Sequence, residues 1–223
     1  MANNQLELPP GALAFSCEGN TNPKSNLYVR KLSLSTSDQI IIGRGYVITG
    51  YNQQQIVEDF TAIGFPDRKI QMLTMASQLR GTECKRFIKA CKNDIILTAE
   101  QDIQLFEILY SRYNEYLTDV LAGTEKRYGK IERSKIEPYQ WEVLIDFLFT
   151  GDLHSNNQDI LLTTLRRSIK LGDPRSFEYL ITDINYWKKA GIEEDRAKMR
   201  AVFVKEWHKY RSKFFFEMGV ISY

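Results

Sequence analysis

Histidine is almost absent from this sequence. Only two of the 223 residues are histidines, His154 and His208, and they lie far apart. This argues against a histidine-based metal site and against a Ser-His-Asp triad. Net charge is also small, because 30 Lys and Arg against 28 Asp and Glu give only +2, so the chain has no global basic field and nucleic acid is not an expected partner. Carboxylates are therefore the catalytic groups to look for, and we expect neither a metal nor another cofactor.

Cysteines are few and follow no paired spacing. Cys17, Cys84 and Cys91 make an odd count, which predicts buried thiols and not a disulfide framework. Residues 1–8 lack the basic and apolar regions of a secretory signal, and no apolar run approaches the ~20 residues of a membrane span. We therefore predict a protein without a membrane span that another machine must deliver if it acts outside its own cytoplasm.

The sequence has the pattern of an α+β protein. A short helix is predicted up to Cys17, with Gly19 as its C-cap. Residues 27–32 and the β-branched run 39–48, which two glycines interrupt, predict strands separated by a polar loop. From residue 51 the apolar period becomes helical. We predict one domain over residues 1–223, with a β lobe at about 20–50 and a helical lobe at about 51–223.

Helix boundaries are predicted mainly from glycines and capping residues. Thr98 and Gln101 form a capping box, which places the start of a long helix there. The charged segment 123–135 is predicted to be a mobile connection. The predicted helices span residues 54–63, 67–79, 82–91, 98–122, 138–150, 156–171, 174–190 and 193–216.

Glu18 is the carboxylate in the most unusual position. It lies where a helix ends, close to the partial negative charge of that terminus, and it follows Leu13, Phe15 and Cys17. Both features raise a carboxyl pKa, as a general acid requires. The competing interpretation is a solvent-exposed glutamate at a helix end.

Several short motifs follow one another in order along nearly the whole chain. They are Phe15-Ser-Cys-Glu18-Gly19-Asn20, Tyr28-Val29, Ile41-Ile42-Gly43-Arg44-Gly45-Tyr46, Leu79-Arg80-Gly81, Cys84-Lys85-Arg86-Phe87, Leu97-Thr98-Ala99-Glu100-Gln101, Tyr139-Gln140-Trp141-Glu142-Val143-Leu144-Ile145-Asp146 and Ala190-Gly191-Ile192-Glu193 with Arg196 and Arg200. Together these motifs resemble the phage-type lysozymes. The branch that they resemble most is the pesticin-like one, the bacterial toxin homologues of T4 phage lysozyme.

This resemblance implies a lysozyme-like fold with a cleft between a small β lobe and a larger helical lobe. It implies that Glu18 is the general acid that protonates the glycosidic oxygen. Ile41 occupies the position where the family has a threonine, and Val47 the position where the pesticin-like branch has an aspartate. Glycoside hydrolysis normally needs two carboxyl groups, and neither aliphatic side chain can activate water.

Three further residues belong to the predicted site. Asp38, in the loop before the strand, either supplies the missing carboxylate or is a turn residue that bonds its own backbone. Arg44 and Tyr46 lie on the strand that lines the sugar cleft in the family. Tyr46 either stacks on a saccharide there or is a buried tyrosine of the sheet.

The resemblance leads to two functional hypotheses. The first is a pseudoenzyme, or a much weakened muramidase, that engages peptidoglycan glycan strands or a partner protein through the old cleft. The second is an active muramidase that hydrolyses the β-1,4 bond of peptidoglycan as a toxin, effector or lysin, with Glu18 as acid. In both cases a secretion system or a phage pore would deliver the protein to the periplasm or a target cell. An immunity or secretion-system protein is a further partner, and an unrelated helical interaction protein is a third interpretation.

Overall fold

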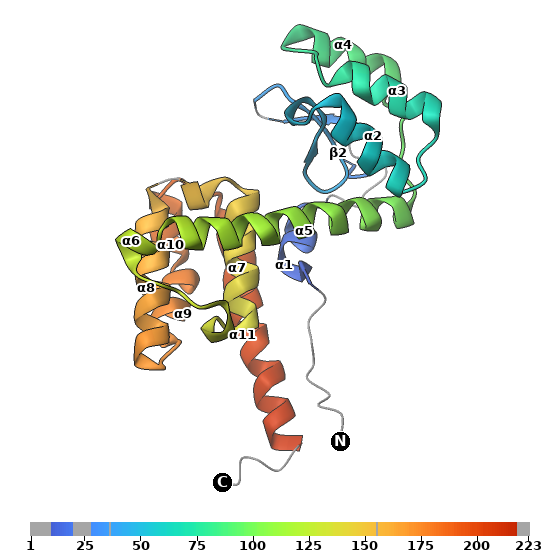
Figure 1. Ribbon diagram of the computed structural model, residues 1–223. Helices are drawn as coiled ribbons and strands as arrows, with labels where there is room; N and C mark the ends of the chain where they lie inside the picture. The colour runs from blue at the N-terminus through green and yellow to red at the C-terminus, as the bar shows by residue number, and fades with distance from the viewer. Residues whose placement is uncertain (1–9, 20–27, 36, 155, 218–223) are drawn as a thin grey trace. The chain divides into compact units, whose positions relative to one another are not determined.

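The computed structural model describes residues 10–19, 28–35, 37–154 and 156–217, with side chains up to Trp207 apart from His154. It confirms the predicted α+β class, because helices predominate and one small antiparallel sheet is present (Figure 1). The chain forms two compact units. The first joins the N-terminal segment up to Cys17 with the chain from Tyr113 on, and the second comprises Glu18–Arg112. The β lobe predicted at 20–50 thus belongs to a larger unit that includes the next three helices.

The sheet of the second unit is a three-stranded antiparallel meander. Its strand order is β1-β2-β3, and Ile41 pairs with both Ser33 on β1 and Val47 on β3. In the described part of the segment predicted as a strand at 27–32, residues 28–32, pairing is limited to isolated bridges such as that between Lys31 and Ile96, and no strand forms. Instead β1 lies in the segment predicted as a polar loop. The strands are β1 (Ser33–Leu34), β2 (Ile40–Ile42) and β3 (Tyr46–Val47), followed by the short helix η1 (Ile48–Gly50).

Side chains alternate across this sheet as the pleat requires. Ile40, Ile42 and Tyr46 are completely buried on the core side. Ile41 and Val47 point to the other side and are half-buried. The core is closed by Phe60 of α2, whose ring packs edge-on against Tyr46.

Helices cover the core side of the sheet. The predicted helix 67–79 ends three residues early, at Ala76, whereas the helix predicted over 82–91 has the predicted bounds. The capping box at Thr98 is confirmed, because its hydroxyl accepts from the Gln101 N–H while the Gln101 side chain accepts from the Thr98 N–H. These helices are α2 (Gln53–Ala62), α3 (Asp67–Ala76), α4 (Thr82–Cys91) and α5 (Ala99–Gly123), the last of which continues into the first unit.

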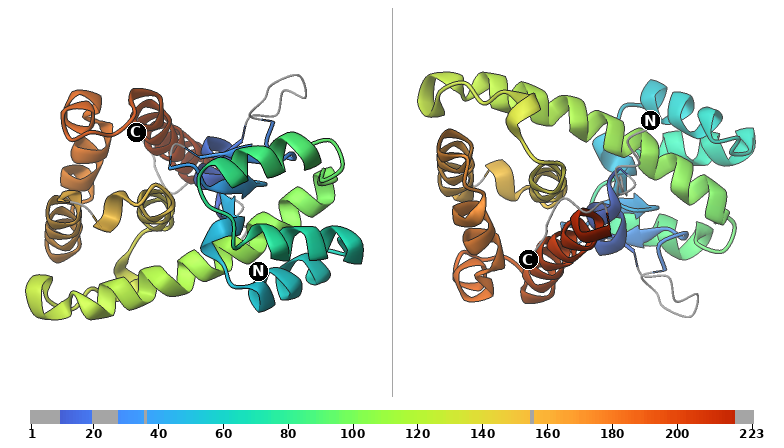
Figure 2. Two further views of the ribbon diagram at one scale, coloured as in Figure 1. Left: turned by 90° about the horizontal axis from the view of Figure 1, so that it is seen from above. Right: turned by 90° about the horizontal axis from the view of Figure 1, so that it is seen from below.

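The first unit is a helical bundle. Figure 2 shows its helices packed side by side, and α1 contacts both α7 and α11. The connection predicted at 123–135 contains two short helices, α6 and η2. The unit comprises α1 (Ala12–Cys17), the end of α5, α6 (Glu125–Tyr128), η2 (Arg133–Lys135), α7 (Pro138–Phe149), η3 (Asp152–His154), α8 (Asn157–Leu171), α9 (Arg175–Thr182), α10 (Ile184–Lys189) and α11 (Glu194–Glu217).

One predicted helix of this unit is two helices. The run 174–190 breaks at Asp183, whose ψ of 83° is not helical. Its carboxylate accepts from the Tyr186 N–H over 2.9 Å and so caps the second helix. An aspartate that satisfies a free helix donor stabilises such a restart, which explains the break.

A buried ion cluster lies in the middle of this bundle. Asp146 on α7 is completely buried and accepts from Arg196 and Arg200 on α11. The Arg200 Nε–Asp146 Oδ2 distance is 2.6 Å, and the Arg200 guanidinium stacks on the Phe147 ring at 3.6 Å from its centroid. Because each charge has a partner, burial of this cluster is tolerated.

Candidate functional site

Glu18 directly follows the last residue of α1, as predicted. Its side chain is half-buried. It is the first residue of the second unit, so the chain passes at this point from the helical bundle to the unit that contains the sheet. A carboxylate at this junction keeps part of its surface accessible to a ligand.

Gly19 is required for a reason that the sequence did not reveal. We predicted Gly19 as the C-cap of the first helix, but its φ is not in the left-handed region that glycine C-caps commonly adopt. Instead, a Cβ on Gly19 would lie 1.8 Å from Nη1 of Arg44. The guanidinium of Arg44 therefore rests on the backbone next to Glu18.

Arg44 reaches this position from the β2–β3 turn. Gly43 and Gly45, on either side of it, have φ values of 62° and 89°, which favour glycine. The Arg44 Nε donates to Oδ2 of Asp102 over 3.2 Å, and both side chains are buried, at 7% and 5% exposed. Asp102 lies in the first turn of α5, so an ion pair connects the hairpin to that helix.

Asp102 is in an unusual electrostatic position. Burial raises the pKa of its carboxyl above the ordinary value of 3.8, and the Arg44 guanidinium opposes this shift. Its second oxygen, Oδ1, is buried and has no hydrogen-bond partner within the described residues. The pair thus fixes Arg44 against Gly19 at some desolvation cost.

Ile41 and Val47 are direct cross-strand partners. They lie opposite each other on the half-exposed side of β2 and β3, and Ser33 faces Ile41 from β1. Directly opposite residues of an antiparallel pair have Cβ atoms ~4.5–5.5 Å apart, so the two positions where the resemblance implies a threonine and an aspartate form one patch. The patch is aliphatic, with one serine hydroxyl beside it.

Tyr46 is a core residue. It is completely buried, its ring packs against Tyr51 and Phe60, and its hydroxyl donates to Asp59 over 2.6 Å. Arg112 also binds this carboxylate. A ring without exposed surface has no face for a saccharide, which corrects the stacking interpretation in favour of the buried sheet tyrosine. Burial and the bond to Asp59 raise the Tyr46 pKa far above its usual range.

Asp38 lies in the turn between β1 and β2, at the other end of β2 from Arg44. It adopts a left-handed backbone with φ of 59°. The turn is held by the Ser35 hydroxyl, which accepts from the Gln39 N–H over 3.0 Å. The Asp38 carboxylate forms an exposed ion pair with Lys85 of α4 over 3.1 Å.

The structure thus forms three groups from the predicted residues. Arg44 lies against the backbone beside Glu18, Ile41 lies opposite Val47, and Asp38 binds Lys85. The sequence did not indicate a role for Asp102, because an acidic residue in a first helical turn is common and its partner Arg44 is 58 positions away.

In the described part of the chain, no group of histidine, cysteine and acidic side chains is arranged to hold a metal. None of the described helices combines the length and the apolar character needed to cross a membrane.

Comparison with known proteins identifies one family. The family described as Domain of unknown function (DUF8812) matches residues 11–201, which include the whole second unit, most of the first unit and all candidate site residues. No curated protein and no solved structure matches the chain.

Proposed function

The chain belongs to the DUF8812 family, and we propose that it is a lysozyme-like protein of the pesticin type. In this proposal the surface around Glu18 and the β2–β3 hairpin binds peptidoglycan glycan strands, and muramidase activity is lost or much weakened. The protein acts on bacterial walls after delivery by a secretion system or a phage pore.

One observation supports the proposed loss of muramidase activity. Ile41 and Val47 are cross-strand partners on the half-exposed side of the sheet, so both family positions for the water-activating groups are aliphatic in the same patch. Glycosidases need a second carboxyl group about 5–9.5 Å from the acid. Glu18 can protonate a leaving group, but aliphatic side chains at these two positions cannot activate water.

Glycan binding is supported by the polar and apolar side chains around Glu18 and the β2–β3 hairpin. Glu18 is half-buried and can hydrogen-bond a sugar hydroxyl. Arg44, fixed by Asp102, lies against the backbone of Gly19 and restricts the conformation of the residue before it. Ile41 and Val47 offer apolar surface to the C–H face of a sugar ring. These features support recognition without turnover.

The test is to restore the missing groups. Purified sacculi are incubated with the wild type and with Ile41→Thr/Val47→Asp, and released muropeptides and bound protein are measured. We expect the wild type to bind sacculi without release. The double variant should release muropeptides, and adding Glu18→Gln should abolish that release. Ile41→Thr/Val57→Asp is the matched control, because Val57 of α2 is 45% exposed and the same change there should restore nothing.

Two results would contradict the proposal. Wild-type protein that does not bind sacculi would exclude glycan recognition. Wild-type release that Glu18→Gln abolishes would show an active enzyme.

The second candidate function, an active muramidase, is favoured by the conformation of Asp38. A non-glycine residue with φ of 59° is uncommon, and such residues concentrate at active sites. Against it, Asp38 already has Lys85 as a counterion and lies at the far end of β2 from Arg44. If this function holds, Asp38→Asn abolishes muropeptide release by the wild type, while Lys85→Gln leaves it in place.

A further inference from the structure

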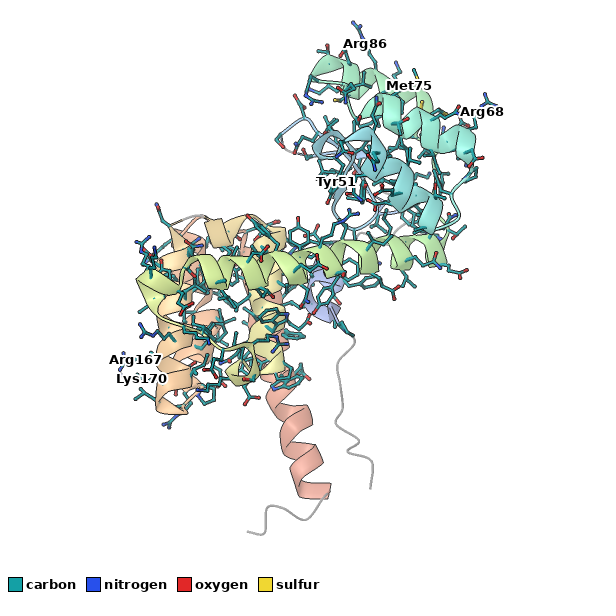
Figure 3. All side chains as sticks on the ribbon, in the orientation of Figure 1. Tyr51, Arg68, Met75, Arg86, Arg167 and Lys170 are labelled. Carbon is teal, nitrogen blue, oxygen red and sulfur yellow. The ribbon has the colours of Figure 1, made fainter. Side chains whose placement is uncertain are left out.

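The exposed side of α4 concentrates positive charge. The segment from Arg80 to Lys92, both included, contains five basic residues and one acidic residue. Lys85, Lys89 and Lys92 have the i, i+4, i+7 spacing, so they form a line along about 10 Å of helix, with Arg86 beside it. All four are exposed, and Figure 3 shows Arg86 pointing outward from α4. These four residues are called the α4 cation row.

Most of this charge is not neutralised within the protein. Lys85 pairs with Asp38, but Arg86, Lys89 and Lys92 have no acidic partner within the described residues. Like charges three and four positions apart repel each other and disfavour a helix. On α11, by contrast, Lys198 is paired with Glu194 on the same helix. The cation row therefore leaves positive charge available to an external anion.

The composition of the helix indicates the kind of anion. Cys84 and Cys91 are buried and Phe87 and Ile88 are half-buried on the side facing the unit, so the exposed side has no large apolar side chain. That side lacks the apolar residues that insert into a lipid surface and the rings that stack on unpaired bases. Lysine ammonium groups bind single phosphates as point charges. A line of such groups matches a linear polymer with one phosphate per repeat.

We propose that the α4 cation row binds a phosphodiester polymer of the bacterial wall, of the teichoic acid type. The choice of the bacterial wall rests on the proposed function, whereas the four residues of the α4 cation row are different from those assigned to glycan binding. Such binding concentrates the protein on the wall, where a second contact to peptidoglycan becomes effectively intramolecular.

The test compares two matched variants of the full chain. Arg86→Gln/Lys89→Gln removes one arginine and one lysine three positions apart from α4. Arg167→Gln/Lys170→Gln removes the same residues at the same spacing from α8, where both are exposed (Figure 3). Each protein is titrated with purified poly(glycerol phosphate) over a series of salt concentrations, and a thermal melt checks that each is folded. The α4 variant should lose about tenfold or more in affinity and have a smaller salt dependence, and the α8 variant should stay within about twofold of the wild type.

Other results would overturn the inference. Absence of salt-sensitive wild-type binding, or equal losses in both variants, would show that α4 is not a specific site. If duplex DNA binds more tightly than the polymer at the same phosphate concentration, and the α4 variant loses this binding, the α4 cation row binds nucleic acid instead.

An experiment with sacculi stripped of teichoic acid separates this inference from the proposed function. The α4 variant should still bind them, and failure of the wild type to bind them while it binds the polymer contradicts only the glycan proposal.

Discussion

At the scale of single residues, the contact between Gly19 and Arg44 restricts position 19 to glycine. A methyl group at Gly19 would lie 1.8 Å from the Arg44 guanidinium, which the buried ion pair with Asp102 prevents from moving freely. Gly19→Ala should therefore lower the free energy of unfolding by about 1–3 kcal/mol, as overpacking does. Urea denaturation measures this change.

Gly50→Ala is the control for that substitution. A Cβ there would meet Val47 at 3.4 Å, an ordinary contact, and the effect should stay within about 1 kcal/mol. A cost for Gly19→Ala as small as this would mean that Arg44 moves away without penalty.

A second residue-scale prediction concerns pH. The Asp102 pKa is raised by burial in the folded protein, so above its ordinary value of 3.8 the folded state binds more protons than the unfolded state. Stability from this group therefore falls as pH rises through the window between 3.8 and the raised pKa. The difference in unfolding free energy between wild type and Asp102→Asn should accordingly decrease as the pH rises above 3.8. A difference that increases over this range would show that attraction to Arg44 outweighs desolvation.

At the scale of elements, the start of α5 is stabilised by side chains. Thr98 and Gln101 satisfy each other's N–H groups, and the Gln101 amide also donates to the Gly64 carbonyl over 3.3 Å, at the end of α2. Thr98→Ala should cost about 1 kcal/mol of unfolding free energy, as loss of an N-cap does. Thr118→Ala, at an exposed position inside α5, should be neutral or slightly stabilising because alanine is the better helix former. Equal effects in chemical denaturation would contradict a capping role.

Elements were predictable where their signals are local. The pair Thr98 and Gln101, and the glycine after Leu171, mark helix ends within a few residues, and the structure has them there. The strand at Ser33–Leu34 was missed because its position depends on pairing with Ile40 and Ile41, not on its own polar sequence. The break at Asp183 was missed because an aspartate inside an apolar period resembles an exposed helical residue.

In the candidate site, too, only the features with a local sequence signal were predictable. Glu18 at the end of α1 was predictable from a local pattern. The support of Gly19 by Arg44 and Asp102 was not, because it joins three segments that only the tertiary fold brings together. The burial of Tyr46 likewise depends on Asp59 and Phe60, which belong to the following helix.

At the scale of the whole molecule, we expect a substitution that destabilises one unit to leave the stability of the other unit unchanged. Asp146→Asn removes the carboxylate that pairs with both Arg196 and the completely buried Arg200, which then has only Asp152 at 3.5 Å as an acidic partner, and should destabilise the first unit by about 3–5 kcal/mol. Hydrogen exchange should then show lost protection in α7 to α11 and little change in the sheet. Glu132→Gln, which removes an exposed ion pair with Lys135, should cost less than about 1 kcal/mol. Equal loss of protection in both units would show that they unfold as one.

The first unit is assembled from both ends of the chain, since α1 packs against α7 and α11 while the whole second unit lies between them in sequence. This has a consequence for biosynthesis. Ribosomes add about 5–20 residues per second, so α1 emerges many seconds before the helices that bury it. The second unit is complete before α7 is made and can fold during that interval. Helix α1 leaves the ribosome early but is thus among the last elements to reach its final contacts, and its apolar face is what a chaperone would meet on the growing chain.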